Sequence, residues 1–238
     1  MIVSAHQPHY LPWIGYFNKI YLSDVFICMD NMNFTNSGFI NRNRILTKNG
    51  ILYLTVPLLK PYGINTKINE LIIENESQSN WKKKHLKSIE HNYSKGIGFN
   101  SFYPILEKEL EKPIDNYFDF QFNIIKTINQ YLNINTKMQL GSTRKTGGIK
   151  ESELILSILE TSECDTFLFG LGASNDYVNK DIILDKGFKF AKQKFNHPYY
   201  KQNNRNFEKG LSIIDCLLRC SKDEAEHIVK QSGKINNE

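Results

Sequence analysis

Apolar residues in this chain form short, strand-like runs that alternate with longer stretches of helical spacing. Residues 2–5 are a short apolar run of the kind that forms a buried strand. Residues 14–22, the next ordered stretch, show the aromatic-rich pattern of an amphipathic helix. The same patterns predict further strands at 24–29, 51–59, 68–73, 166–169 and 188–195, and further helices at 79–94, 100–111, 114–133, 150–161 and 211–219.

Strands that alternate with helices are typical of an α/β fold. We therefore predict a single α/β domain over residues 1–238, in which a mixed sheet carries helices on its flanks. The helical patterns at 79–133 follow one another without a strand between them, which indicates a helical subdomain or cap within that domain. The Lys-Asn-Gly sequence at 48–50, just before a strand, predicts a hairpin turn.

Composition indicates where the protein is located rather than which reaction it catalyses. The chain of 238 residues carries a formal net charge of +5 and has no apolar run that approaches the ~20 residues of a membrane-spanning helix. With no signal-like start, we expect a cytoplasmic protein that does not insert into a membrane. The lysines at 82–84 and 87 are compatible with nucleic acid as a partner, but a phosphorylated small molecule or a solvated helix face fits them equally well, and the mild charge does not favour nucleic acid.

The turn after the first predicted strand is the strongest candidate for a functional site. His6 and Gln7 stand where that strand ends, and open α/β sheets bind ligands outside the carboxyl ends of their strands. Asp30 follows the second predicted strand in the same way. If the two strands are neighbours, the Asp30 carboxylate can hold one tautomer of His6 and increase its basicity.

A polar quartet, Asn41-Arg42-Asn43-Arg44, is a second candidate. Two guanidinium groups and two amides within four residues suit the recognition of a carboxylate or phosphate. The same residues also suit an edge strand whose charges prevent pairing with another chain. The sequence leaves both interpretations open.

Further candidates lie later in the chain. Thr146 and Gly147 belong to a segment of hydroxyls, glycines and cations before a predicted helix, an arrangement that can hold an anion. Gly170 and Gly172 form a glycine turn after the strand at 166–169. His85 lies at the edge of a buried helix face, where a ligand contact and a hydrogen-bonded interfacial histidine are both compatible with the pattern.

In this order the motifs resemble the WbqC-like family over nearly the whole chain. The matching elements are His6-Gln7-Pro8 with residues 10–13, residues 24–26 with Asp30, residues 41–45 and 54–57, Trp81 with His85, Thr146-Gly147, the Gly170 and Gly172 turn with Tyr177, His197-Pro198 with Tyr200 and Gln202, and residues 211–215. Members of this family are associated with bacterial surface-polysaccharide (O-antigen) loci. The resemblance therefore implies a role in making or decorating a sugar.

Our leading hypothesis is an N-acyl or aminoacyl transferase that acts on a nucleotide-linked amino sugar. Such a reaction needs a base for the amine proton and donors for the developing oxyanion. An acyl-coenzyme A or acyl-carrier-protein thioester would be the co-substrate, and we expect neither a metal nor a tightly bound cofactor. The expected catalytic residues are His6 and Asp30, with His85 and His197 in reserve; the expected substrate-binding residues are Gln7, Tyr10, Trp13, Asn41, Arg42, Asn43, Arg44, Thr146, Gly147, Gly170, Gly172 and Gln202.

Two alternatives come from other functional classes. A metal-dependent sugar deacylase or hydrolase would draw on the histidines and acidic residues of the same motifs, although none of them has the spacing of a helical metal-ligand pair. A non-catalytic module that binds a sugar nucleotide is the other alternative. The density of acid–base side chains favours an enzyme over that module.

Overall fold

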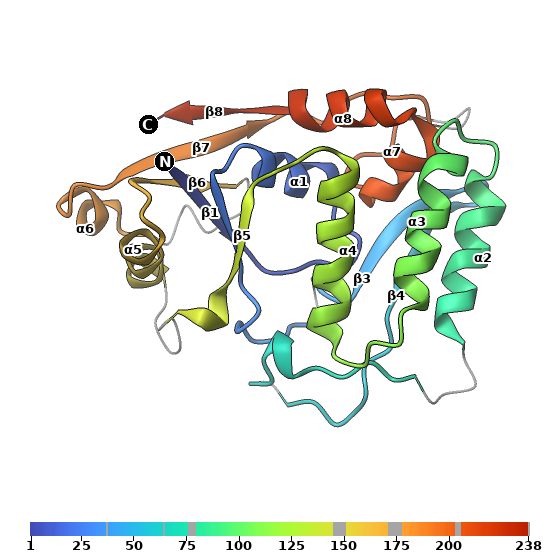
Figure 1. The fold of residues 1–238 in the computed structure, drawn as a ribbon, viewed down its shortest axis with the longest axis horizontal. Coiled ribbons are helices and arrows are strands. Elements are labelled where there is room, and N and C mark those ends of the chain that lie inside the picture. Colours follow the sequence, from blue (N-terminus) through green and yellow to red (C-terminus); the bar gives the residue numbers. More distant parts are fainter. Residues whose placement is uncertain are drawn as a thin grey trace.

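A six-stranded sheet forms the centre of the fold (Figure 1). The computed structural model describes residues 1–36, 38–63, 65–75, 80–144, 151–170, 178–202 and 206–237. The strand order is β5–β2–β1–β6–β7–β8, with five parallel strands and an antiparallel β8 at one edge. This arrangement confirms the predicted mixed α/β sheet. The strands are β1 (Ile2–His6), β2 (Val25–Cys28), β5 (Lys137–Leu140), β6 (Thr166–Phe169), β7 (Lys189–Phe195) and β8 (Gly233–Asn237).

Helices cover both faces of this sheet, because its strands are apolar on both sides. On β2, Phe26 and Cys28 pack into a hydrophobic cluster that includes helix α1 (Ile14–Tyr21). Their neighbours Val25 and Ile27 point the other way and join a second cluster with helix α5 (Glu151–Ser162). The short helix α6 (Lys180–Leu184) contacts α5, and α8 (Lys222–Gln231) contacts α1.

A second group of helices lies on the side of the molecule away from α5 and α6 (Figure 1). It consists of α2 (Trp81–Tyr93), α3 (Phe99–Glu111), α4 (Tyr117–Tyr131) and α7 (Ile213–Arg219). The first three occupy the predicted helical region 79–133, and their apolar residues belong to the same cluster as α1 and α7. The hairpin of β3 (Arg42–Thr47) and β4 (Gly50–Thr55), with its turn at the predicted place, packs against α7.

Residues 68–73 do not form the predicted strand, so that prediction is wrong. They form a short 3₁₀ turn, η1 (Ile68–Glu70), followed by two isolated bridges at 72 and 73. The Glu70 carboxylate accepts a hydrogen bond from the Lys67 amide at 3.0 Å, which closes the turn. The Asn69 amide donates to the Asp30 carbonyl at 2.9 Å, so η1 contacts the end of β2.

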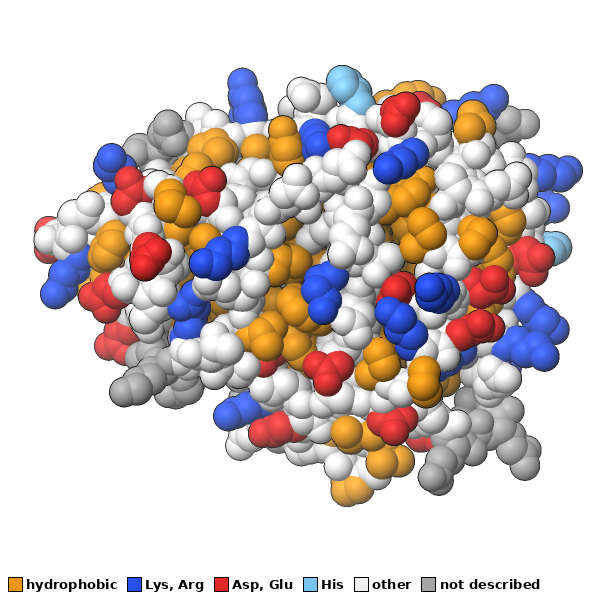
Figure 2. All heavy atoms as spheres, in the orientation of Figure 1, with side chains coloured by type: hydrophobic (Ala, Val, Ile, Leu, Met, Phe, Trp, Pro, Cys, Tyr) orange, Lys and Arg blue, Asp and Glu red, His pale blue; other side chains and the backbone are white. Residues whose placement is uncertain are grey.

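Among the described residues, the α-helices α6 and α8 and the strands β5 and β8 were not predicted, because their sequences are short or polar. Figure 2 shows that lysines, arginines and acidic residues are interspersed over the visible face, in agreement with the mild net charge. No helix among the described residues has the length and apolar character needed to cross a membrane.

Candidate functional site

The connections that leave β1 and β6 run toward opposite edges of the sheet. From β1 the chain proceeds through α1 to β2 on one side, whereas β6 pairs with β1 on the other side. Connections that leave neighbouring strands in opposite directions open a crevice, and open α/β sheets bind their ligands there. A cavity of about 460 Å³ lies at this point. Its volume is within the range of ~300–1,000 Å³ typical of small-molecule sites.

The cavity combines a polar end with apolar walls. His6 and Gln7 from the end of β1, Lys19 from α1 and Gly170 from the end of β6 form the polar end. The walls consist of the apolar side chains of Met29, Met32, Leu154, Ile155, Ile158, Phe167, Phe169 and Val178. Such a cavity suits a ligand whose apolar part is buried and whose polar group lies near His6.

His6 is held in one orientation by its own turn. Its Nδ1 lies 2.8 Å from the Gln7 carbonyl oxygen, which can only accept, so Nδ1 carries the proton. The ring packs edge-on against His9 and Tyr16, with centroids 4.7 and 5.1 Å away. Burial, followed by the nearby His9 and Lys19, lowers the pKa of His6 well below its usual value. The ring is therefore neutral at pH 7, and Nε2 is its proton acceptor.

Lys19 lies at the polar end of the cavity, although the sequence pattern did not single it out. Its side chain is buried, and Nζ donates a hydrogen bond to the Ala5 carbonyl at 2.9 Å. Burial lowers the pKa of Lys19 to about 8. Asn18 and Lys19 are polar residues within the amphipathic pattern at 14–22, and both are buried. A lysine beside a second polar residue in an otherwise apolar, aromatic helix was the available signal.

Asp30 has partners other than His6. Its carboxylate accepts from the Asn69 side chain at 3.1 Å and from the Ser142 amide at 2.8 Å, and only 2% of the residue is exposed. β1 and β2 are neighbours as expected, with the Met29 amide bonded to the His6 carbonyl at 2.9 Å. Among the described residues, however, the expected contact between the two side chains is not formed, because the Asp30 carboxylate binds groups from η1 and the segment after β5.

The two arginines of the polar quartet bind backbone carbonyls. Arg44 donates from Nε to Gly210 at 3.1 Å and from Nη2 to Lys209 at 3.0 Å. Arg42 donates from Nε to Gly38 at 3.3 Å. These contacts join the hairpin to neighbouring loops. Neither arginine lines the cavity at His6.

The two asparagines of the quartet also have structural partners. The Asn43 side chain donates to the carbonyls of Tyr10 and Leu11, at 3.1 and 2.7 Å. Asn41 donates to the Val56 carbonyl at 3.0 Å. Asn43 therefore fixes the turn that follows His6 by joining it to β3, and it acts on the candidate site only through that turn.

His85 is part of the interior of the helical group. Its Nδ1 lies 3.0 Å from the Tyr10 hydroxyl, and its ring packs edge-on against Trp81 with centroids 5.2 Å apart. Burial lowers the pKa of His85 to about 4. Neither His85 nor Tyr10 lines the cavity at His6. Of the two interpretations left open by the sequence, the structure shows the hydrogen-bonded interfacial histidine.

His197 and Trp13 lie together in another part of the molecule, and Gln202 binds the backbone of Glu208. His197 is exposed, and its ring centroid lies 5.6 Å from that of Trp13. The Gln202 side chain exchanges two hydrogen bonds with the Glu208 backbone, at 3.1 and 2.8 Å. None of the three lines the cavity at His6.

Of the candidates from the sequence, His6, Gln7 and Gly170 line the cavity. Thr146, Gly147 and Gly172 lie outside the residues that the structure describes. Within the described ranges, no three His, Cys, Asp or Glu side chains come close enough together to hold a metal ion.

Comparisons with known proteins add a family match. Residues 7–227 match the model of the WbqC-like protein family. An uncharacterized protein of Mycobacterium tuberculosis is 27% identical over 228 residues, which cover 95% of this chain and 96% of that protein. No solved structure matches the chain.

Proposed function

The chain belongs to the WbqC-like protein family, and we propose that it transfers an acyl group to the amino group of a nucleotide-linked sugar in surface-polysaccharide biosynthesis. The observation that supports this proposal is the cavity at the carboxyl ends of β1 and β6, whose apolar walls end at a neutral imidazole. An acyl chain fits the walls, and its carbonyl carbon would lie at the polar end. The donor is a thioester of coenzyme A or of an acyl carrier protein.

The proposed reaction makes one bond and breaks one. The sugar amine attacks the thioester carbonyl carbon, so a C–N bond forms, and the C–S bond breaks when the tetrahedral intermediate collapses. His6 accepts the proton that the amine loses and returns it to the departing sulfur, which leaves as a thiol. Nδ1 of His6 is committed to the Gln7 carbonyl, so this proton moves through Nε2.

The low pKa of His6 has two consequences for this role. It keeps the ring unprotonated at neutral pH, so that no proton has to be removed before the reaction. It also makes the ring a weaker base than a solvent-exposed histidine, which means that its position next to the bound amine is the larger contribution. Gln7 lines the same cavity, and in this proposal its side-chain amide donates a hydrogen bond to the carbonyl oxygen of the donor.

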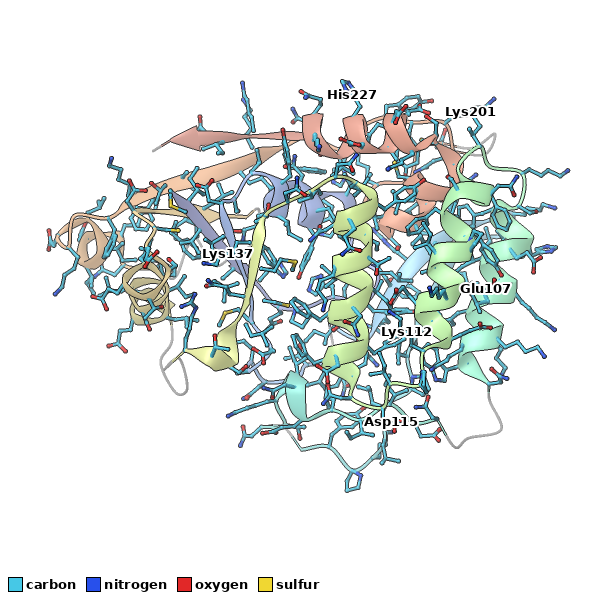
Figure 3. All side chains as sticks on the ribbon, in the orientation of Figure 1. Glu107, Lys112, Asp115, Lys137, Lys201 and His227 are labelled. Carbon is cyan, nitrogen blue, oxygen red and sulfur yellow. The ribbon has the colours of Figure 1, made fainter. Side chains whose placement is uncertain are left out.

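His6→Gln tests this proposal. We expect acyl transfer to fall by roughly 10²–10⁴-fold, the usual contribution of a general base. Transfer is measured by mass spectrometry on mixtures of nucleotide-linked amino sugars with short- and medium-chain acyl-coenzyme A donors. His227→Gln is the matched control, because His227 is an exposed residue of α8 (Figure 3). Full turnover in His6→Gln would exclude His6 as the base.

A thermal-shift screen of the same protein separates the proposed function from the alternatives. Ligands that bind only the native state raise its melting temperature. We expect a rise with an acyl-coenzyme A donor and with a nucleotide-linked amino sugar. Stabilisation by zinc or manganese alone, together with release of an acyl group from the sugar, would contradict the transferase and support the hydrolase.

A further inference from the structure

The amine of Lys19 lies beside a largely apolar cavity, in buried surroundings where a lysine is uncommon. Its residue is only 6% exposed, and Nζ lies 2.9 Å from the Ala5 carbonyl oxygen. An ammonium group carries three hydrogens, and a buried donor without an acceptor is unfavourable by roughly 1–3 kcal/mol. In the described part of the chain, the Ala5 carbonyl is the acceptor within hydrogen-bond distance of Nζ, so further donors remain for a group in the cavity.

Gly170 lines the cavity beside the amine of Lys19. A Cβ at this position would lie 3.5 Å from Nζ and 3.7 Å from Cδ of Lys19, in van der Waals contact with the end of that side chain. A larger side chain would add further atoms to this Cβ beside the amine. Gly170 therefore places no side-chain atoms of its own next to Nζ, where β6 ends.

Among the described residues, none that lines the cavity with Lys19 carries a carboxylate. The residues that line the cavity with it are apolar, apart from His6 and Gln7, and Asp30 is bound to Asn69 and Ser142. A cation in apolar surroundings attracts an anionic or strongly polarised oxygen more strongly than a solvated cation does. The remaining hydrogens of Lys19 thus face a volume that suits an apolar molecule with one such oxygen.

We propose that this cavity recognises an acyl compound through its terminal oxygen, with Lys19 Nζ donating to that oxygen and the walls from α5, β2 and β6 burying the carbon chain. This inference rests on the proposed function for the identity of the donor and extends it to the substrate class. The oxygen is either the carboxylate of a free acid or the carbonyl of a thioester. Lys19 contacts the substrate and is thereby a binding residue for both.

The proposal is tested by titrating the whole protein calorimetrically with octanoate, and with octanol as a probe of the same chain length without the carboxylate. For Lys19→Met we expect octanoate to bind at least roughly tenfold more weakly, the usual effect of losing a hydrogen bond to a charged group. Octanol binding should be unchanged, since the apolar walls are intact. The control Lys137→Met removes an exposed lysine on β5 (Figure 3) and should leave octanoate binding unchanged.

Gly170→Val provides a second variant that retains Lys19 and covers its amine. We expect this variant to bind octanoate as weakly as Lys19→Met, while its unfolding transition remains cooperative. A structural role for Lys19, as a tie between α1 and the Ala5 carbonyl, would change thermal stability in Lys19→Met without changing octanoate affinity. Unchanged octanoate affinity in either variant, or no octanoate binding to the wild-type protein at millimolar concentration, would overturn the proposal.

A third titration with octanoyl-coenzyme A separates the two sources of the oxygen. Weaker binding of both probes to Lys19→Met identifies the thioester as a ligand of the amine, whereas weaker binding of octanoate alone identifies a free acid. The outcomes are also distinct from those of the acyl-transfer assay. If octanoate binding depends on Lys19 but no acyl transfer is found, the binding site is supported and the transferase is rejected. If acyl transfer occurs and is unaffected by Lys19→Met, the transferase is supported and the role of Lys19 in binding is rejected.

Discussion

At the scale of single residues, the role of a buried polar side chain depends on the groups with which it forms hydrogen bonds. Asp215, one of the acidic groups that a metal site could have used, is fully buried and accepts three hydrogen bonds. These come from the hydroxyls of Tyr93 and Tyr200, at 2.6 and 2.8 Å, and from Nε of Arg219 at 3.0 Å. The carboxylate therefore joins α2, α7 and the segment after β7, and its role is structural.

Asp215→Asn is expected to destabilise the protein by about 3–5 kcal/mol. The substitution removes the negative charge that lies 3.0 Å from Nε of the buried Arg219, which is more unfavourable than losing a hydrogen bond alone. The free energy of unfolding in urea measures the effect. Asp185→Asn is the control, because Asp185 is exposed, and it should change stability by less than about 0.5 kcal/mol. Equal midpoints for both variants would show that the network contributes little.

At the scale of elements, the loop between α2 and α3 and the end of α7 touch backbone to backbone. A Cβ on Gly98 would lie 2.0 Å from the Leu217 carbonyl oxygen and 2.2 Å from that of Cys220. A Cβ on Gly96 would meet the Leu218 carbonyl oxygen at 2.0 Å. The two glycines therefore permit α2 and α3 to pack against α7, which in turn packs against β3 and α8.

Gly98→Ala should weaken this junction strongly. Because the added methyl group would meet backbone atoms, which cannot rotate away, we expect a loss of at least about 2 kcal/mol in the free energy of unfolding. Gly63→Ala serves as the control, since its Cβ would have only the Thr66 hydroxyl nearby, at 3.8 Å. If urea unfolding gave the same midpoint for both variants, the close contact with α7 would not be a constraint on the fold.

At the scale of the whole molecule, one buried and two half-buried histidines link stability to pH. His6, His9 and His85 come from different parts of the chain, and burial lowers the pKa of each, to about 4 for the last two. In the unfolded chain the histidine pKa values are near 6.5. Between about pH 4 and 6.5 the unfolded chain therefore binds more protons than the native state. The free energy of unfolding should therefore decrease as the pH falls from about 6.5 toward 4.

The share of His85 in this pH dependence can be isolated with His85→Gln, which retains a hydrogen-bonding side chain next to Tyr10. Between pH 7 and about pH 4.5, the wild-type protein should lose about 2 kcal/mol more stability than this variant. Urea unfolding at the two pH values gives the difference. An identical loss in both proteins would mean that His85 does not titrate with a lowered pKa.

Much of the fold was predictable because local sequence determines local structure. The runs at 2–5 and 24–29 became the central parallel strands β1 and β2, and the helices of region 79–133 formed where the apolar spacing placed them. The polar strand β8 was not predictable, because it gains its place only by pairing with β7. Residues 68–73 were misassigned for the related reason that their apolar residues pack from a turn held by contacts with other segments.

For the site, the sequence by itself determined the family resemblance and the position of His6 and Gln7 at the end of the first strand. Only the tertiary structure decided which other side chains meet them. Periodicity predicts that residues 14–22 form an amphipathic helix, but not which segments pack against its polar residues. The side-chain amide of Asn18 donates to the Val229 carbonyl of α8 at 2.9 Å, and Lys19 Nζ donates to the Ala5 carbonyl near the end of β1. In the same way, the Asp30 carboxylate binds the Asn69 side chain of η1, because hydrogen bonds form between groups that are close in space, and the sequence does not show which groups those are.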